Sequence, residues 1–206
     1  MRISEFQKVG QDLFVRGLVS SHGGNMSVRL GDRLVITRRG SQLNHLTEKD
    51  LVETGVALND RQTPSASSEL AIHRTIYQRT RAHSIVHAHP IMALALSLGE
   101  GEIVHLDAEG RRTIGVVPVV GGRVIAEVRE VVDEMAALLQ DHPIVMVRGH
   151  GCFAIGQLLD EAHRWTSLLE DSARLIHAAR ALQSSFQRET PGKQSHGPRR
   201  KTAVGE

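Results

Sequence analysis

The sequence contains one cysteine, Cys152, and aromatic residues make up only 3% of its 206 positions. A single cysteine excludes an internal disulfide framework and any zinc site built from several cysteines, so a metal site in this chain must rest on imidazole and carboxylate groups. The formal net charge is only +2. Because few aromatic side chains are available for base stacking, we expect no nucleic-acid partner.

Long apolar runs are also missing. No stretch approaches the roughly 20 apolar residues that a membrane span needs, and residues 1–5 lack the apolar run of a signal peptide. We therefore expect a cytoplasmic protein without a membrane partner.

The remaining composition is that of an ordinary globular domain, with 40% hydrophobic and 23% charged residues. We expect one domain, residues 1–186. Residues 187–206 carry basic side chains among glycine, proline, serine and glutamine, without apolar periodicity. This last segment is predicted to be a basic disordered tail.

Apolar spacing predicts alternating helices and strands. The helices are expected at residues 4–17, 67–79, 91–98, 123–140 and 159–182. The strands are expected at residues 26–30, 34–37, 51–58, 84–89, 103–106, 114–119, 144–147 and 152–155, with a turn at 107–110. Because the strands are short and several are joined by tight turns, we expect a three-layer α/β fold in which helices cover a central, mainly antiparallel β-sheet.

A pair of histidines ends one predicted strand, in the sequence His87-Ala88-His89-Pro90. Alternate side chains of a strand share a face, so His87 and His89 can reach one metal ion from the same direction. Pro90 has no backbone N–H and should end the strand directly after the pair. The alternative is that each histidine is only a hydrogen-bonded core or surface residue.

A third ligand is expected from Arg148-Gly149-His150-Gly151, which follows another apolar strand. Three imidazoles are typical of a catalytic zinc site that keeps one coordination position open. Cys152 is the alternative fourth ligand and would close the site. Its apolar neighbours favour a small buried residue instead.

Ser67-Ser68-Glu69 begins a predicted helix. Free backbone N–H groups and the helix dipole favour an anion at such a helix start, and a carboxylate near zinc can act as acid and base. Taken alone, these three residues favour an ordinary helix cap with a dipole-compatible glutamate. The functional interpretation, which needs a phosphate-bearing substrate, makes Ser67 and Ser68 phosphate-binding candidates and Glu69 a catalytic candidate.

Two loops offer further hydrogen-bond donors to a phosphate group. One contains Gly24 and Asn25, and the other runs from Thr37 through Gly40 to Ser41. Taken alone, both are ordinary hairpin loops. No G-x-G-x-x-G or P-loop motif supports nucleotide binding.

Five motifs in this order resemble the class II aldolase and adducin head family, most closely its fuculose-1-phosphate aldolase branch. The motifs are Gly24-Asn25-Met26-Ser27-Val28-Arg29, Thr37-x-x-Gly40, Ser67-Ser68-Glu69, His87-x-His89 and Arg148-Gly149-His150-Gly151. The resemblance covers residues 3–182. It implies that His87, His89 and His150 bind one Zn²⁺ per subunit and that Glu69 is the catalytic acid and base. The residues that it implies for the phosphate pocket are Asn25, Thr37, Gly40, Ser67 and Ser68.

The resemblance also implies an activity and an assembly. The expected reaction is the reversible retro-aldol cleavage of a phosphorylated sugar, a ketose 1-phosphate, to dihydroxyacetone phosphate and an aldehyde, with zinc stabilising the enediolate. The expected assembly is a homotetramer with active sites at the interfaces. The alternatives are a sugar-phosphate 4-epimerase, a methylthioribulose-1-phosphate dehydratase or a decarboxylase with the same zinc chemistry, or a non-catalytic adducin-like interaction module.

One position departs from the family pattern. The fuculose phosphate enzymes carry a tyrosine soon after the His-x-His helix that protonates the aldehyde oxygen, whereas this chain has Val104-His105-Leu106-Asp107 there, and its only tyrosine is Tyr77. His105, Asp107 or a residue of a neighbouring subunit is expected to supply the proton, unless the aldehyde partner differs.

Overall fold

The computed structural model describes residues 3–122 and 128–189. The α-helices are α1 (Ile3–Val15), α2 (Leu70–Arg79), α3 (Ile91–Ser97), α4 (Ala108–Thr113), α5 (Val128–Leu138) and α6 (Leu159–Glu189). The 3₁₀ turns are η1 (Leu43–His45), η2 (Glu48–Asp50) and η3 (Thr63–Ser65). The strands are β1 (Asn25–Leu30), β2 (Arg33–Thr37), β3 (Leu51–Gly55), β4 (Ser84–Ala88), β5 (Glu102–Val104), β6 (Val116–Val120), β7 (Ile144–Val147) and β8 (Gly151–Gly156).

The strands form one eight-stranded sheet in the order β3-β2-β1-β4-β8-β7-β6-β5. Every neighbouring pair is antiparallel except β6 and β7. The chain passes from one half of the sheet to the other at β4, whose neighbours are β1 and β8.

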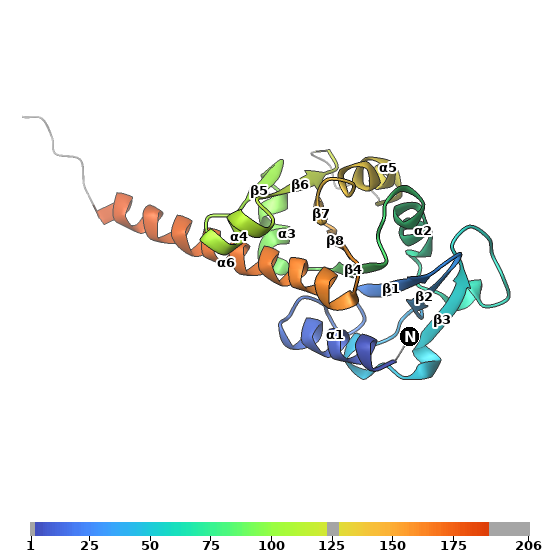
Figure 1. The fold of residues 1–206 in the computed structure, drawn as a ribbon. Helices are drawn as coiled ribbons and strands as arrows, with labels where there is room; N and C mark the ends of the chain where they lie inside the picture. The colour runs from blue at the N-terminus through green and yellow to red at the C-terminus, as the bar shows by residue number, and fades with distance from the viewer. Residues whose placement is uncertain (1–2, 123–127, 190–206) are drawn as a thin grey trace, which may run out of the picture.

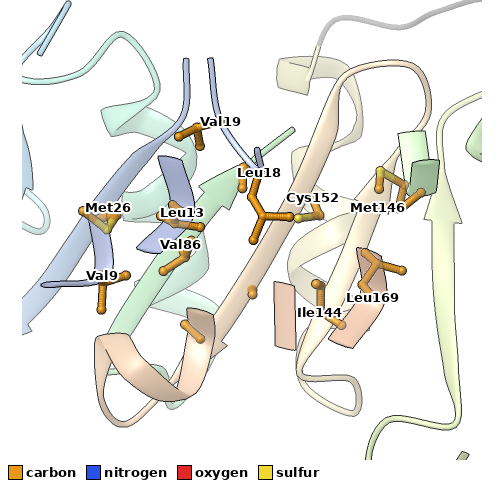
Figure 2. Packing of buried hydrophobic residues seen from close by; sticks show 14 of the residues in the cluster. Val9, Leu13, Leu18, Val19, Met26, Val86, Ile144, Met146, Cys152 and Leu169 are labelled. Carbon is orange, nitrogen blue, oxygen red and sulfur yellow. The ribbon is translucent and has the colours of Figure 1, made fainter. Parts of the chain in front are cut away.

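Helices cover both faces of the sheet (Figure 1). Helices α1, α3 and α6 pack on one face, in a core that includes Leu13, Val86 and Cys152 (Figure 2). Helices α2 and α5 pack on the other face, around Ile85 and Phe153. Alternate residues of β4 enter opposite cores, as expected for a strand buried on both faces. The predicted three-layer α/β fold with a mainly antiparallel sheet is confirmed.

Several predicted boundaries differ from the structure, among them the following three. The expected turn at residues 107–110 begins the short helix α4, because the Asp107 carboxylate accepts a hydrogen bond from the Gly110 N–H at its start. Strand β3 ends at Gly55 rather than residue 58, since the chain folds back there and brings the Leu58 carbonyl within 2.5 Å of the space a Cβ would need. Helix α6 extends past residue 182 to Glu189.

Residues 187–189 of the expected tail therefore belong to α6, and residues 190–206 lie outside the described residues. The expected helix start at 123–127 also lies outside them. No helix in the described part of the chain is long and apolar enough to cross a membrane.

Candidate metal centre

The two predicted ligand segments meet because β4 and β8 are antiparallel neighbours. Ala88 at the end of β4 pairs with Cys152 at the start of β8, so His87 and His89 lie beside the turn that carries His150. The ligand nitrogens of these three histidines lie within 4.8 Å of one another. The structure thus brings the three predicted ligands together.

Hydrogen bonding prepares His87 to bind a metal. Its Nδ1 lies 2.9 Å from the Cys152 carbonyl oxygen and donates to it, which leaves the lone pair of Nε2 facing the cluster. Burial lowers the pKa of His87 to about 3, against an opposing effect of the Glu69 carboxylate. The imidazole is therefore neutral at physiological pH, as a metal ligand must be.

Cys152 does not belong to this cluster. Its side chain enters the core under α6, next to Leu18 (Figure 2), on the face of the sheet opposite to His87. Burial raises the pKa of its thiol to about 12. The expectation of a small buried cysteine, rather than a fourth ligand, agrees with this position.

Glycines allow the surrounding loops to approach the imidazoles. A Cβ on Gly23 would lie 2.9 Å from Nδ1 of His89, and a Cβ on Gly24 would lie 2.7 Å from the His87 carbonyl oxygen. Gly24 also has a φ of 76°, which disfavours any side chain. The loop before β1 therefore closes over the metal centre only because these positions lack side chains.

Glu69 lies at the amino-terminal end of α2 and faces the three histidines. Its Oε1 is 3.0 Å from Nε2 of His150, and its Oε2 is 3.3 Å from Nε2 of His87. Burial by itself would raise the pKa of the carboxyl group, but the interactions with His150, His87 and Asn25 lower it well below its usual range. Glu69 is thus an ionised carboxylate beside the candidate metal ligands. It is the N-cap residue of α2 without a side-chain cap bond, and not a residue of the first turn.

A chain of buried hydrogen bonds lies behind Glu69. Asn25 Nδ2 is 2.6 Å from Glu69 Oε2, and Asn25 Oδ1 is 2.6 Å from Nε2 of His73. The Ser27 hydroxyl oxygen lies 2.6 Å from Nδ1 of His73 and 2.7 Å from the Tyr77 hydroxyl oxygen. The sequence interpretation missed His73 and the part played by Tyr77. Their spacing of four and eight residues from Glu69 on one helix face is the signal that could have indicated them.

A cavity of about 200 Å³ opens next to Glu69 and the histidines. Of the residues implied for the phosphate pocket, Asn25, Gly40, Ser67 and Ser68 line it. Arg38, Arg39 and Ser41 of the predicted donor loop 37–41 line it as well, and so does His22, which was not predicted. Thr37 does not line the cavity. Its side chain is buried, and its hydroxyl faces the backbone, where it accepts a hydrogen bond from the Met26 N–H. A larger cavity of about 640 Å³, around Ala82 and Trp165, contains no predicted site residue.

The residues considered in place of the family tyrosine lie elsewhere. His105 is buried, and its Nδ1 is 2.6 Å from the hydroxyl oxygen of Ser172 on α6, which also donates to the Asp107 carboxylate. Neither His105 nor Asp107 lines the cavity of the same subunit. Tyr77 is a buried residue of α2, and its hydroxyl is hydrogen-bonded to Ser27.

The donor set fits a zinc ion. Three imidazole nitrogens converge, His87 is held in the tautomer that presents Nε2, and a carboxylate lies beside them without a fourth soft ligand that would close the site. Such a set belongs to catalytic rather than closed structural zinc sites.

Comparisons with known proteins agree with this geometry. Residues 4–177 match the family model of the class II aldolase and adducin N-terminal domain. The L-fuculose phosphate aldolase of Methanocaldococcus jannaschii is 30% identical over 179 residues, which cover 83% of this chain and 93% of that protein. The crystal structure of L-fuculose-1-phosphate aldolase from Thermus thermophilus aligns with a TM-score of 0.81 and 35% identity, covering 92% of this chain and 97% of that chain.

A relative with a different named activity is nearly as similar. The 3-oxo-tetronate 4-phosphate decarboxylase of Escherichia coli is 28% identical over 188 residues, which cover 84% of each protein. The fold, the site geometry and the family model lead to one conclusion: the chain belongs to the class II aldolase and adducin N-terminal domain family.

Proposed function

We propose that this chain is a zinc-dependent class II aldolase that reversibly cleaves a ketose 1-phosphate, of the fuculose-1-phosphate type, to dihydroxyacetone phosphate and an aldehyde. The observation that carries the proposal is the position of the Glu69 carboxylate. It lies 3.0 Å from one candidate zinc ligand and 3.3 Å from another, in a cavity that Ser67 and Ser68 also line.

In this proposal His87, His89 and His150 hold the ion. When bound, zinc supplies Lewis acidity to the carbonyl group of the substrate. Glu69 removes the proton from C3 of dihydroxyacetone phosphate in the synthetic direction and returns it after cleavage. An ionised carboxylate suits this task because it can accept the proton without first losing one.

The same cavity would receive the phosphate group. Ser67 and Ser68 offer hydroxyls in its lining, and Gly40 has a φ of 75° with nothing within 4 Å of the position that a Cβ would take. Arg38 donates its Nε–H to the Lys49 carbonyl oxygen and is anchored at the rim. Arg39 is exposed and lines the same rim, so its guanidinium can pair with a phosphate.

We further propose that copies of the chain associate as a homotetramer with active sites near the interfaces. Large apolar side chains stay exposed on α3, β5 and α6 or directly after α3 and β5, and they support this assembly. They are Ile91, Met92, Leu98, Val104, Leu106, Leu175 and Leu182. A neighbouring subunit would then supply the aldehyde proton, since the described residues that line the cavity include no tyrosine.

Replacing Glu69 with glutamine tests the role of its carboxylate. Glu69→Gln should keep zinc bound, as measured by metal analysis, and should slow the exchange of the C3 proton of dihydroxyacetone phosphate with deuterated water by at least about 100-fold. Unimpaired exchange in the zinc-loaded variant would exclude Glu69 as the base.

A second candidate function is decarboxylation of a phosphorylated 3-oxo acid. The similarity to a decarboxylase and the two arginines at the cavity favour it. Incubating the zinc-loaded protein with pentulose and hexulose phosphates and with a phosphorylated 3-oxo acid separates the reactions. Aldehyde release supports the aldolase proposal. Carbon dioxide release, water loss or epimerisation without aldehyde release would refute it and favour a decarboxylase, a dehydratase or an epimerase, respectively.

A further inference from the structure

The hydrogen bonds behind Glu69 have one consistent direction. An ionised carboxylate can only accept hydrogen bonds, so the Asn25 atom next to it must be the amide nitrogen, and the Asn25 oxygen must face His73. His73 therefore carries its proton on Nε2 and accepts from the Ser27 hydroxyl at Nδ1. Ser27 in turn accepts from the Tyr77 hydroxyl.

Burial enforces this direction. Ser27 and His73 have no exposed surface, Tyr77 is 1% exposed and Asn25 is 6% exposed. A rotated Asn25 amide would place its oxygen against the Glu69 carboxylate and its nitrogen against the His73 Nε2–H. Two acceptors and two donors would then face each other where little water can intervene, at a cost of about 1–3 kcal/mol for each unsatisfied polar group. Asn25 therefore keeps a single orientation as long as His73 is neutral and donates from Nε2.

We propose that His73 is a positioning residue for catalysis: through Asn25 it fixes the orientation of the Glu69 carboxylate toward the metal centre. This inference rests on the proposed role of Glu69 as the base. His73 does not touch the cavity, which Asn25 and Glu69 line, so it acts only through its neighbours. The network is not a proton relay, because an amide group between His73 and Glu69 does not pass a proton on at neutral pH.

Two amide substitutions of His73 separate positioning from stability. The amide nitrogen of glutamine takes the place of histidine Nε2 and can still donate to Asn25. The amide nitrogen of asparagine takes the place of Nδ1 and cannot reach Asn25. Both variants replace a buried ring by a smaller amide, so His73→Gln and His73→Asn are matched in polarity and lose similar packing.

We expect kcat for zinc-dependent proton exchange to fall by about 100-fold in His73→Asn, the size of effect that a small misplacement of a catalytic group produces. His73→Gln should keep at least about a third of the rate. KM should change by less than about threefold in both, and zinc content should stay equal, since no metal ligand contacts His73 through a hydrogen bond. Equal losses of kcat in the two variants would overturn the proposal and assign His73 a purely structural role.

Crystal structures of the two variants give a readout that needs no activity. The Asn25 to Glu69 hydrogen bond should persist in His73→Gln and be lost or rotated in His73→Asn. An unchanged Glu69 in both structures would overturn the positioning role. Failure of the unmodified, zinc-loaded protein to exchange or cleave any substrate would instead refute the proposed function, and the structures would still decide whether His73 orients Glu69.

Discussion

At the scale of single residues, two buried histidines of this site, His87 and His73, use their ring nitrogens in opposite ways. His87 donates from Nδ1 to a backbone carbonyl and presents Nε2 to the cluster, whereas His73 donates from Nε2 to Asn25 and accepts at Nδ1. Both rings are buried and neutral, but their hydrogen-bond partners decide which nitrogen has the free lone pair. Hydrogen-bond partners, rather than burial, therefore distinguish the candidate ligand His87 from the hydrogen-bonding residue His73.

The neutrality of His73 predicts a dependence of stability on pH. Burial lowers the pKa of His73 to about 4 from its ordinary value of 6.5, opposed by Glu69. Between these values the unfolded chain binds the proton and the folded chain does not, so the stabilisation present above pH 6.5 is lost as the pH falls, by at most about 1.4 kcal/mol per pH unit.

Urea unfolding at about pH 7.5, 6.5 and 5.5 measures the free energy of unfolding of the metal-free protein. His73→Gln is the reference, because glutamine at position 73 does not titrate. The free-energy advantage of the unmodified protein should shrink as the pH falls below about 6.5. Parallel stability curves for the two proteins would mean that the pKa of His73 is the same in the folded and unfolded states, which would contradict its burial as a neutral group.

At the scale of elements, the candidate metal centre depends on close contact between the end of β4 and the start of β8. A Cβ on Gly151 would lie 2.5 Å from the Ala88 carbonyl oxygen, 2.6 Å from Cδ2 of His89 and 3.0 Å from Cε1 of His87. Backbone on one side and two ligand rings on the other leave no room for a methyl group. The first residue of β8 is thus a glycine because the strand pairing and the ligand cluster share one space.

Gly151→Ala is therefore expected to weaken metal binding and to destabilise the fold by about 1–3 kcal/mol, the usual cost of overpacking. Gly99→Ala is the matched control, since nothing lies within 4 Å of a Cβ at that position. Zinc affinity by competition with a chromogenic chelator, together with urea unfolding, measures both effects. Tight zinc binding by Gly151→Ala would show that β8 can move away without loss of the site.

At the scale of the whole molecule, we expect the fold to form without a metal ion. Two apolar cores fill the space on either side of an eight-stranded sheet, and the three predicted ligands lie at one end of two of its strands. A structural zinc site, by contrast, replaces a core that a small domain cannot build. The candidate metal centre is thus expected to be an addition to a fold that is already complete.

Chelation should accordingly abolish turnover without unfolding the protein. The far-ultraviolet circular dichroism spectrum should be unchanged, and stability should fall only by the binding contribution, about 3 kcal/mol at a free zinc concentration of about 100 times Kd. Thermal unfolding with and without chelator measures the difference. Loss of the spectrum on chelation would make the zinc structural.

Local patterns in the sequence determined much of this protein. Strand alternation put His87 and His89 on one side, Pro90 ended their strand, and the helix-start pattern placed Glu69 at the amino-terminal end of α2. These features depend on residues within a few positions of each other, so the sequence alone predicts them. The mixed order of helices and strands likewise predicted the layered fold.

Only the tertiary structure decided what each side chain faces. The sequence predicted similar loops at Asn25 and Thr37, but Asn25 is the first residue of β1 and Thr37 the last residue of β2. The Thr37 hydroxyl accepts a hydrogen bond from the Met26 N–H, whereas the Asn25 amide is held between Glu69 and His73. Cys152 lies two residues from His150 but on the other face of the sheet from His87. Local sequence predicts the alternation along a strand, whereas the pairing of distant strands and the helices packed on each face determine which side becomes core, cavity or metal centre.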